Sequence, residues 1–133
     1  MTLVTLYLAT AVIFIVLDAL MLRFYMQPLF ADRIGGLMTD QVRWLPAALF
    51  YMGYLAGVLY LVSLPALKSG MPVQALLGGM VLGAVAYGTY EFTNYAILRD
   101  WHWQMVVSDT VWGAVLTGLS AWGGLLITRA VAP

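Results

Sequence analysis

The residues with the clearest chemical potential lie in one stretch, Tyr87 to Tyr95, which places a carboxylic acid, an amide and several hydroxyls inside an apolar run. Asp18 and Asp109 interrupt two other apolar runs in the same way. An ionisable side chain in hydrocarbon is costly unless it is paired or hydrogen-bonded, so an acid within a membrane span predicts a functional site. These residues suit proton exchange, or binding of a cation or a hydrogen-bond donor.

The composition indicates that a membrane must surround these residues. Of 133 residues, 63% are hydrophobic and only 9% are charged, whereas about a quarter of the residues in a soluble domain carry charge. Four apolar runs, about 3–25, 45–67, 73–98 and 105–128, are long enough to cross a bilayer core as helices. We therefore predict an all-α membrane protein, a single domain (1–133) of four transmembrane helices in an antiparallel bundle.

The connection from Gln27 to Trp44 combines charged and apolar side chains. This mixture favours a short interfacial segment between the first and second spans, with an ordinary polar loop as the alternative. The net charge is zero and no basic cluster is present, which argues against nucleic acid as a partner. The lipid bilayer is the expected partner.

Counting along the predicted spans brings the acids to a common depth. Asp18 and Glu91 precede the ends of their spans and Asp109 follows the start of its own, so a rise of about 1.5 Å per residue puts all three roughly 7 to 11 Å below the same surface. The same counting brings tyrosine, asparagine and tryptophan side chains to this level. The predicted ligand-binding set is Asp18, Tyr51, Tyr54, Tyr87, Tyr90, Glu91, Asn94, Asp109 and Trp112.

The chemistry of such a layer follows from its charge. Burial disfavours an ionised carboxyl, and neighbouring carboxylates repel each other, so a shared proton or a bound cation stabilises the cluster. Oxygen ligands would suit a hard cation such as Mg²⁺ or Ca²⁺, but we predict neither a metal site nor a cofactor. The one histidine, His102, lies in a loop between two tryptophans, a pattern more typical of an interfacial anchor than of a catalytic base.

Several ordered motifs resemble the small bacterial membrane family known as domain of unknown function 2177. They are Asp18-Ala-Leu-Met-Leu, Leu49-Phe-Tyr followed by Leu64-Pro-Ala-Leu, Gly83-Ala-Val-Ala-Tyr-Gly-Thr-Tyr-Glu-Phe-Thr-Asn94, and Trp101 ahead of Ser108-Asp-Thr-Val-Trp-Gly113. The chain departs from the family pattern in having Glu91 in place of aspartate and Met21 where tryptophan is common. The resemblance implies four membrane helices and a bacterial inner membrane, and it implies no activity.

Three functions stay open from the sequence. The leading hypothesis is a binding or transport role, in which the polar layer holds a small polar or cationic ligand or relays protons. The first alternative is a membrane-embedded enzyme that acts on a lipid or isoprenoid headgroup, with Asp18, Glu91 or Asp109 as general acid or base. The second is an accessory subunit whose polar layer only specifies helix packing. A homodimer through small-residue faces such as Gly53-x-x-x-Gly57 is a further option.

The distribution of basic residues predicts an orientation that can be tested. Arg23, Arg33, Arg43 and Arg99 flank the acid-rich side, so the positive-inside rule puts that side in the cytoplasm and both termini outside. Because the chain has no cysteine, a single Ser69→Cys substitution gives a unique label site. A membrane-impermeant maleimide added to intact cells should label it; labelling only after the cells are opened would reverse the orientation.

Overall fold

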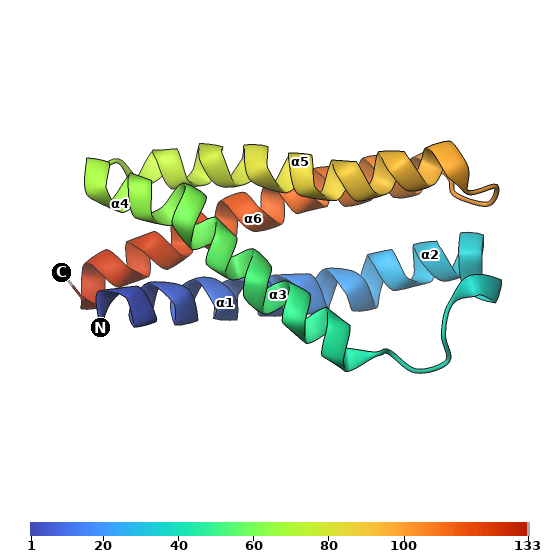
Figure 1. The fold of residues 1–133 in the computed structure, drawn as a ribbon, viewed down its shortest axis with the longest axis horizontal. Coiled ribbons are helices and arrows are strands. Elements are labelled where there is room, and N and C mark those ends of the chain that lie inside the picture. Colours follow the sequence, from blue (N-terminus) through green and yellow to red (C-terminus); the bar gives the residue numbers. More distant parts are fainter. Residues whose placement is uncertain (133) are drawn as a thin grey trace.

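The computed structural model describes residues 1–132, and helices account for nearly all of them, with no strand in this range. The elements are α1 (Thr2–Met21), η1 (Leu22–Met26), α2 (Gln27–Ile34), η2 (Gly35–Leu37), α3 (Trp44–Val58), η3 (Leu59–Ser63), α4 (Leu64–Ser69), α5 (Pro72–Ile97) and α6 (Trp103–Val131). They join into four rods, 2–37, 44–69, 72–97 and 103–131, each long and apolar enough to cross a membrane. The rods alternate in direction, and both termini lie at one end (Figure 1). The predicted all-α fold with four membrane helices is confirmed.

Two prolines explain why several elements join without a break. Proline has no N–H to bond to the carbonyl four residues earlier, and Pro28 and Pro65 each follow a π-helical turn, η1 and η3. In these wider turns the N–H of Gln27 bonds to the carbonyl of Leu22, and that of Leu64 bonds to Leu59, five residues earlier in both cases. The helices therefore continue past both prolines.

The first rod is longer than the predicted first span because α2 continues the line of α1 (Figure 1). The apolar side chains of α2, Leu29, Phe30 and Ile34, pack on a cluster made by Trp101, Met105 and Val106 at the start of α6. The first part of the predicted interfacial segment is therefore a helix held against the protein. The extended connection to the second span begins only after η2.

Close contact between α5 and α6 forms the centre of the bundle. A Cβ atom added at Gly79 would lie 2.8 Å from the backbone of Gly118, and one added at Gly83 would fall on the carbonyl oxygen of Gly113. Only glycine allows two helix backbones to approach so closely in lipid. α1 packs on the other side of α6, with Leu6, Phe14 and other apolar side chains buried between the rods.

The second rod crosses the bundle obliquely (Figure 1). Its far end contacts α5, where Val62 of η3 lies beside Gly78, whereas α3 diverges from α5 toward its own beginning. Gly53 and Gly57 have no atom of the described chain within 4 Å of an added Cβ. This glycine pair thus packs against no other helix of the described chain, unlike the glycines of α5 and α6.

A matched pair of substitutions tests this difference between glycines. Gly79→Val should destabilise the fold by about 1–3 kcal/mol or more, because the added methyl groups force the two backbones apart. Gly53→Val makes the same chemical change in open space and should have little effect on stability. Unfolding in increasing dodecyl sulfate, followed by circular dichroism, measures the stability of both variants. An equal loss of stability in the two would contradict the close contact between α5 and α6.

Candidate functional site

Asp18 ties three helices together through its carboxylate. Its Oδ2 accepts a hydrogen bond of 2.6 Å from the hydroxyl of Tyr51 on α3, and its Oδ1 accepts one of 3.1 Å from the indole N–H of Trp112 on α6. The side chain is buried, with 6% of its residue surface exposed. Both oxygens therefore have a donor, as a carboxylate in an apolar setting requires.

Glu91 lies in a separate, sealed position. The residue is 0% exposed, and its Oε1 accepts a hydrogen bond of 3.0 Å from the indole N–H of Trp101. The Trp101 ring is packed edge-on against Phe30 of α2, at 5.5 Å, and Tyr90 of α5, at 5.7 Å. The second oxygen, Oε2, is buried and has no hydrogen-bond donor among residues 1–132.

Asp109 stands between the other two acids. Its carboxyl lies close enough to those of Glu91 and Asp18 for their charges to act on it. No tyrosine, tryptophan or amide group of the described residues donates to it, in contrast to Asp18. Asp109 is only partly buried and so has a free side that faces a cavity.

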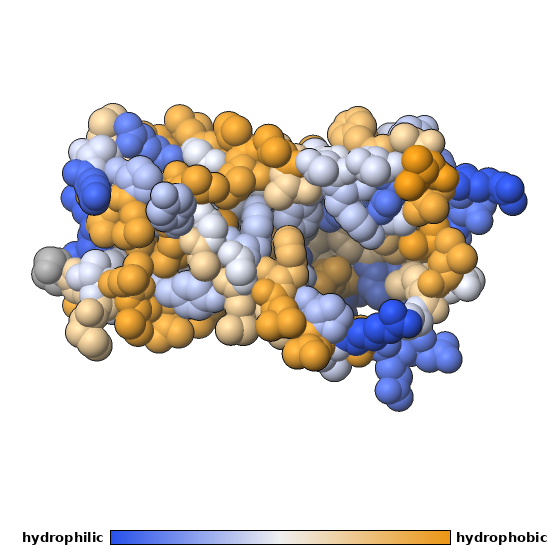
Figure 2. All heavy atoms as spheres, viewed as in Figure 1, coloured by the Kyte–Doolittle hydropathy of each residue, from blue (hydrophilic) through white to orange (hydrophobic). Residues whose placement is uncertain are grey.

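That cavity, the carboxyl chamber, has a volume of about 600 Å³. It is formed by α1, α3, α5 and α6 together with η1. No lysine, arginine or histidine is among its lining residues. They are Asp18, Leu22, Met26, Ala47, Phe50, Tyr51, Ala86, Tyr87, Thr89, Tyr90 and Asp109. Figure 2 shows a depression in this face of the molecule, beside the oblique α3, with hydrophilic residues at its floor and rim and apolar ones around them.

Asp18 lies deeper than the other two acids, and this corrects the predicted common depth of the three. Along α6, at about 1.5 Å per residue, Asp109 lies about 9 Å and Trp112 about 14 Å from Trp103. Asp18 bonds to Trp112 and lies deeper than Asp109, whereas Glu91, six residues before the end of α5 at Ile97, lies about 9 Å from that end and so at the level of Asp109. The sequence-based count placed Asp18 too near the surface because the first helix does not end near residue 25.

The other predicted site residues divide into those near the chamber and those apart from it. Tyr87 and Tyr90 line the chamber with Tyr51. Tyr54 instead bonds through its hydroxyl to Thr117 at 2.8 Å, and Asn94 is not among the lining residues. The chamber therefore brings together Asp18, Asp109 and three tyrosines, and leaves Glu91 behind its wall.

Sequence reasoning missed Trp101 and the apolar walls of the chamber. Trp101 was interpreted as a membrane anchor, but only 6% of its surface is exposed, whereas Trp103 is 58% exposed. Trp101 lies ten residues after Glu91, just beyond the end of α5. This short spacing is the signal that could have identified Trp101 as a donor to Glu91. Phe50, Ala47 and Met26 carry no such signal, because only the path of α3 and η1 brings them to the cavity.

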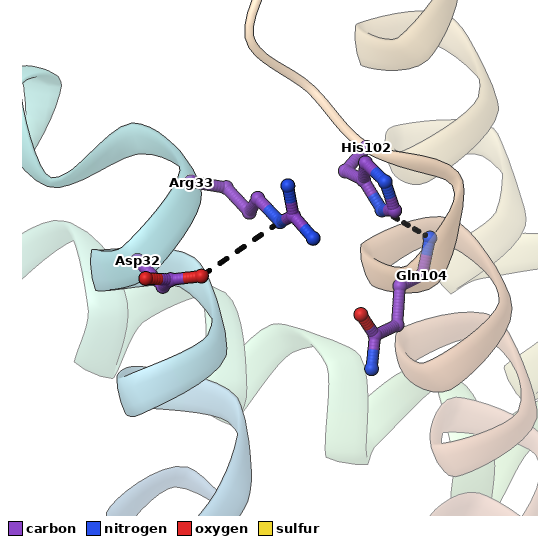
Figure 3. Close-up of polar contacts among 4 residues, drawn as sticks. All are labelled: Asp32, Arg33, His102 and Gln104. Atoms are coloured by element: carbon purple, nitrogen blue, oxygen red, sulfur yellow. Dashed lines mark hydrogen bonds and ion pairs between the residues drawn. The ribbon is translucent and has the colours of Figure 1, made fainter.

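The polar groups of the adjoining loop do not take part in the chamber. His102 begins α6, where its Nδ1 accepts the backbone N–H of Gln104 at 3.1 Å, and Arg33 lies 3.9 Å from Asp32 on α2 (Figure 3). Exposed ion pairs of this kind contribute little stability. Among residues 1–132, no three His, Cys, Asp or Glu side chains gather as a metal-binding set.

Comparison with known families agrees with the architecture. The sequence matches the family described as "Predicted membrane protein (DUF2177)" over residues 3–126, a range that contains all three acids. The chain belongs to this family. The resemblance drawn from the sequence motifs is thereby confirmed. No curated protein and no solved structure matches the chain, so its function has to be argued from the site.

The hydrogen bonds to Asp18 lead to a stability prediction. Tyr51→Phe and Trp112→Phe each remove one donor to a buried carboxylate and should cost about 1.5–3 kcal/mol. Tyr60→Phe is the matched control, since Tyr60 is 76% exposed and the same hydroxyl is lost there without consequence. Unfolding free energies in detergent compare the three variants; if Tyr51→Phe behaves like Tyr60→Phe, the bond to Asp18 contributes nothing.

Proposed function

We propose that this protein binds a small cationic ligand with hydrogen-bond donors in the carboxyl chamber, within the membrane, for capture or transport. The observation that carries the proposal is the pairing of Asp18 and Asp109 on one cavity whose lining has no basic side chain. Opposite charges 4 Å apart attract by about 4 kcal/mol where the effective dielectric constant is near 20. A cation in the chamber would therefore be held far more strongly than in water.

The size and walls of the chamber fit this role. Its volume of about 600 Å³ is within the range of about 300–1,000 Å³ usual for small-molecule sites. Such sites combine apolar walls with a few polar groups that orient the ligand. Here Asp18 and Asp109 offer the charge, and the hydroxyls of Tyr87 and Tyr90 offer further hydrogen bonds.

The path of the ligand is proposed from the position of the opening. The depression lies beside α3 (Figure 2), and the rods 44–69 and 72–97, which line the chamber through α3 and α5, are each suited to cross a membrane. A ligand would therefore enter sideways from the lipid as well as from the nearby surface. We expect the membrane to be the bacterial inner membrane, and a homodimer through exposed small-residue faces stays a prediction.

A proton relay is the second candidate, and Glu91 is the observation in its favour. Its buried Oε2 lacks a donor, while the Asp109 carboxyl interacts with Glu91. One proton shared between the two carboxyls would supply the missing hydrogen bond. Asp109 also lines the chamber, so a proton could pass between the sealed acid and the ligand site, and cation release could be coupled to protonation.

Asp109 separates these proposals from the packing alternative. The bonds of Asp18 to Tyr51 and Trp112 are also what a structural acid would make. Asp109 receives no such bond from a neutral donor and faces the cavity. Helix packing alone therefore does not explain an acid at this position.

Amide substitutions test the binding proposal directly. Asp109→Asn should leave folding intact and lower the affinity for n-butylammonium by about tenfold or more, equivalent to at least about 1.4 kcal/mol. Asp18→Asn should do the same, with some loss of stability. Isothermal titration of the protein in nanodiscs measures the affinity.

The control for this test is an acid outside the chamber. Asp40→Asn removes the same charge in the exposed connection after η2 and should leave the affinity unchanged. If butylammonium binds with equal affinity to all variants, or binds to none including the wild type, the chamber is not a cation site.

A further inference from the structure

A second hollow lies beside the carboxyl chamber, along the face of α3. This α3 groove has a volume of about 420 Å³, and its lining extends from Leu49 to Leu61, with Leu82 of α5 on the other wall. No charged side chain lines it. Gly53 and Gly57 form part of its floor, and open space surrounds both. The groove is therefore apolar, and no side chain fills it at the two glycines.

The groove and the chamber meet at Phe50, which lines both. The Phe50 ring is stacked on Tyr54, with centroids 5.6 Å apart and planes 14° apart. The Tyr51 ring has its centroid 6.3 Å from that of Phe50, and the Tyr51 hydroxyl donates to Asp18. One aromatic ring thus separates an acidic cavity from an apolar groove.

The two hollows are also ordered along the membrane normal. The chamber lies toward the start of α3 at Trp44, and the groove continues along the helix from there to Leu61. From Leu49 to Leu61 the helix rises about 18 Å. A membrane amphiphile has the same order, with a polar headgroup near the surface and an alkyl chain directed toward the centre of the bilayer.

We infer that the ligand of the chamber is an amphiphilic amine, whose cationic headgroup lies against Asp18 and Asp109 and whose alkyl chain lies in the α3 groove. This inference rests on the function proposed above and adds the class of ligand. Charge complementarity and the adjacency of the two hollows at Phe50 select this occupant. A helix from a second copy would cover the groove, yet it would leave the acids of the chamber without a counter-charge.

Photo-crosslinking locates the alkyl chain. The probe is dodecylamine with a diazirine in mid-chain, added to the protein in nanodiscs, and the labelled peptides are identified by mass spectrometry. In the wild type, labelling should concentrate between Leu49 and Leu61. Gly57→Leu fills the groove and should abolish this labelling, whereas n-butylammonium, which has too short a chain to reach the groove, should bind as before.

Ala56→Leu is the matched control. It adds similar bulk to the neighbouring position of α3, which is exposed but does not line the groove, and it should leave the labelling unchanged. Asp18→Asn should reduce both the crosslinking and the binding of butylammonium, since both depend on the headgroup site.

The outcomes separate the two proposals. Labelling spread evenly over the lipid-facing helices and unaffected by Gly57→Leu, with butylammonium binding still dependent on Asp18, would overturn the amphiphile and leave the cation site. An unlabelled groove, together with dimers that Gly57→Leu converts to monomers, would also overturn it by assigning the groove to a second copy. Loss of the cation site itself would appear as butylammonium binding that is indifferent to Asp18→Asn.

Discussion

The structure depends on one constraint, which is that a carboxyl group placed in hydrocarbon must find hydrogen-bond donors or counter-charges inside the protein. Asp18 meets it with Tyr51 and Trp112, and Glu91 meets it in part with Trp101. The two bonds of Asp18 join segments far apart in the chain and so hold three helices in position, whereas the bond of Glu91 ties the end of α5 to the turn that follows it. Asp109 receives no hydrogen bond from a tyrosine, tryptophan or amide side chain of the described residues and faces the chamber.

Helix packing leaves open the chamber in which the ligand is proposed to bind. α5 and α6 approach through glycines, which makes one side of the bundle dense. The second rod crosses obliquely and contacts α5 through η3 and α4, which leaves the other side open where α3 begins. The π-helical turn η1 contributes Leu22 and Met26 to the chamber wall, in keeping with the frequent occurrence of such turns at functional sites. The dense side fixes the acids, and the open side admits a ligand.

The binding, relay and amphiphile proposals concern a single continuous surface. Glu91 lies sealed under Trp101, Asp109 interacts with it and faces the chamber, and Phe50 connects the chamber to the apolar groove. Under these proposals the surface would hold, side by side, a proton, a cation and an alkyl chain. These parts are compatible with exchange of a proton for a cationic amphiphile.

The sequence by itself determined the four apolar rods, the family, and the presence of Asp18, Glu91 and Asp109 inside membrane helices, because apolar length and charge content are local properties. The depth count along the spans also predicted Tyr51, Tyr87 and Tyr90, which line the chamber, together with Tyr54, which does not. The tertiary structure alone decided that Glu91 is walled off, that Trp101 is a buried donor, and that Asp18 lies deeper than Glu91 and Asp109. The physical reason is that the helices continue through Pro28 and Pro65 by π-helical turns, and that the tilt of α3 depends on where glycines permit contact. These non-local contacts set the depth of each acid and the direction of its side chain. A count of residues along one span cannot predict them.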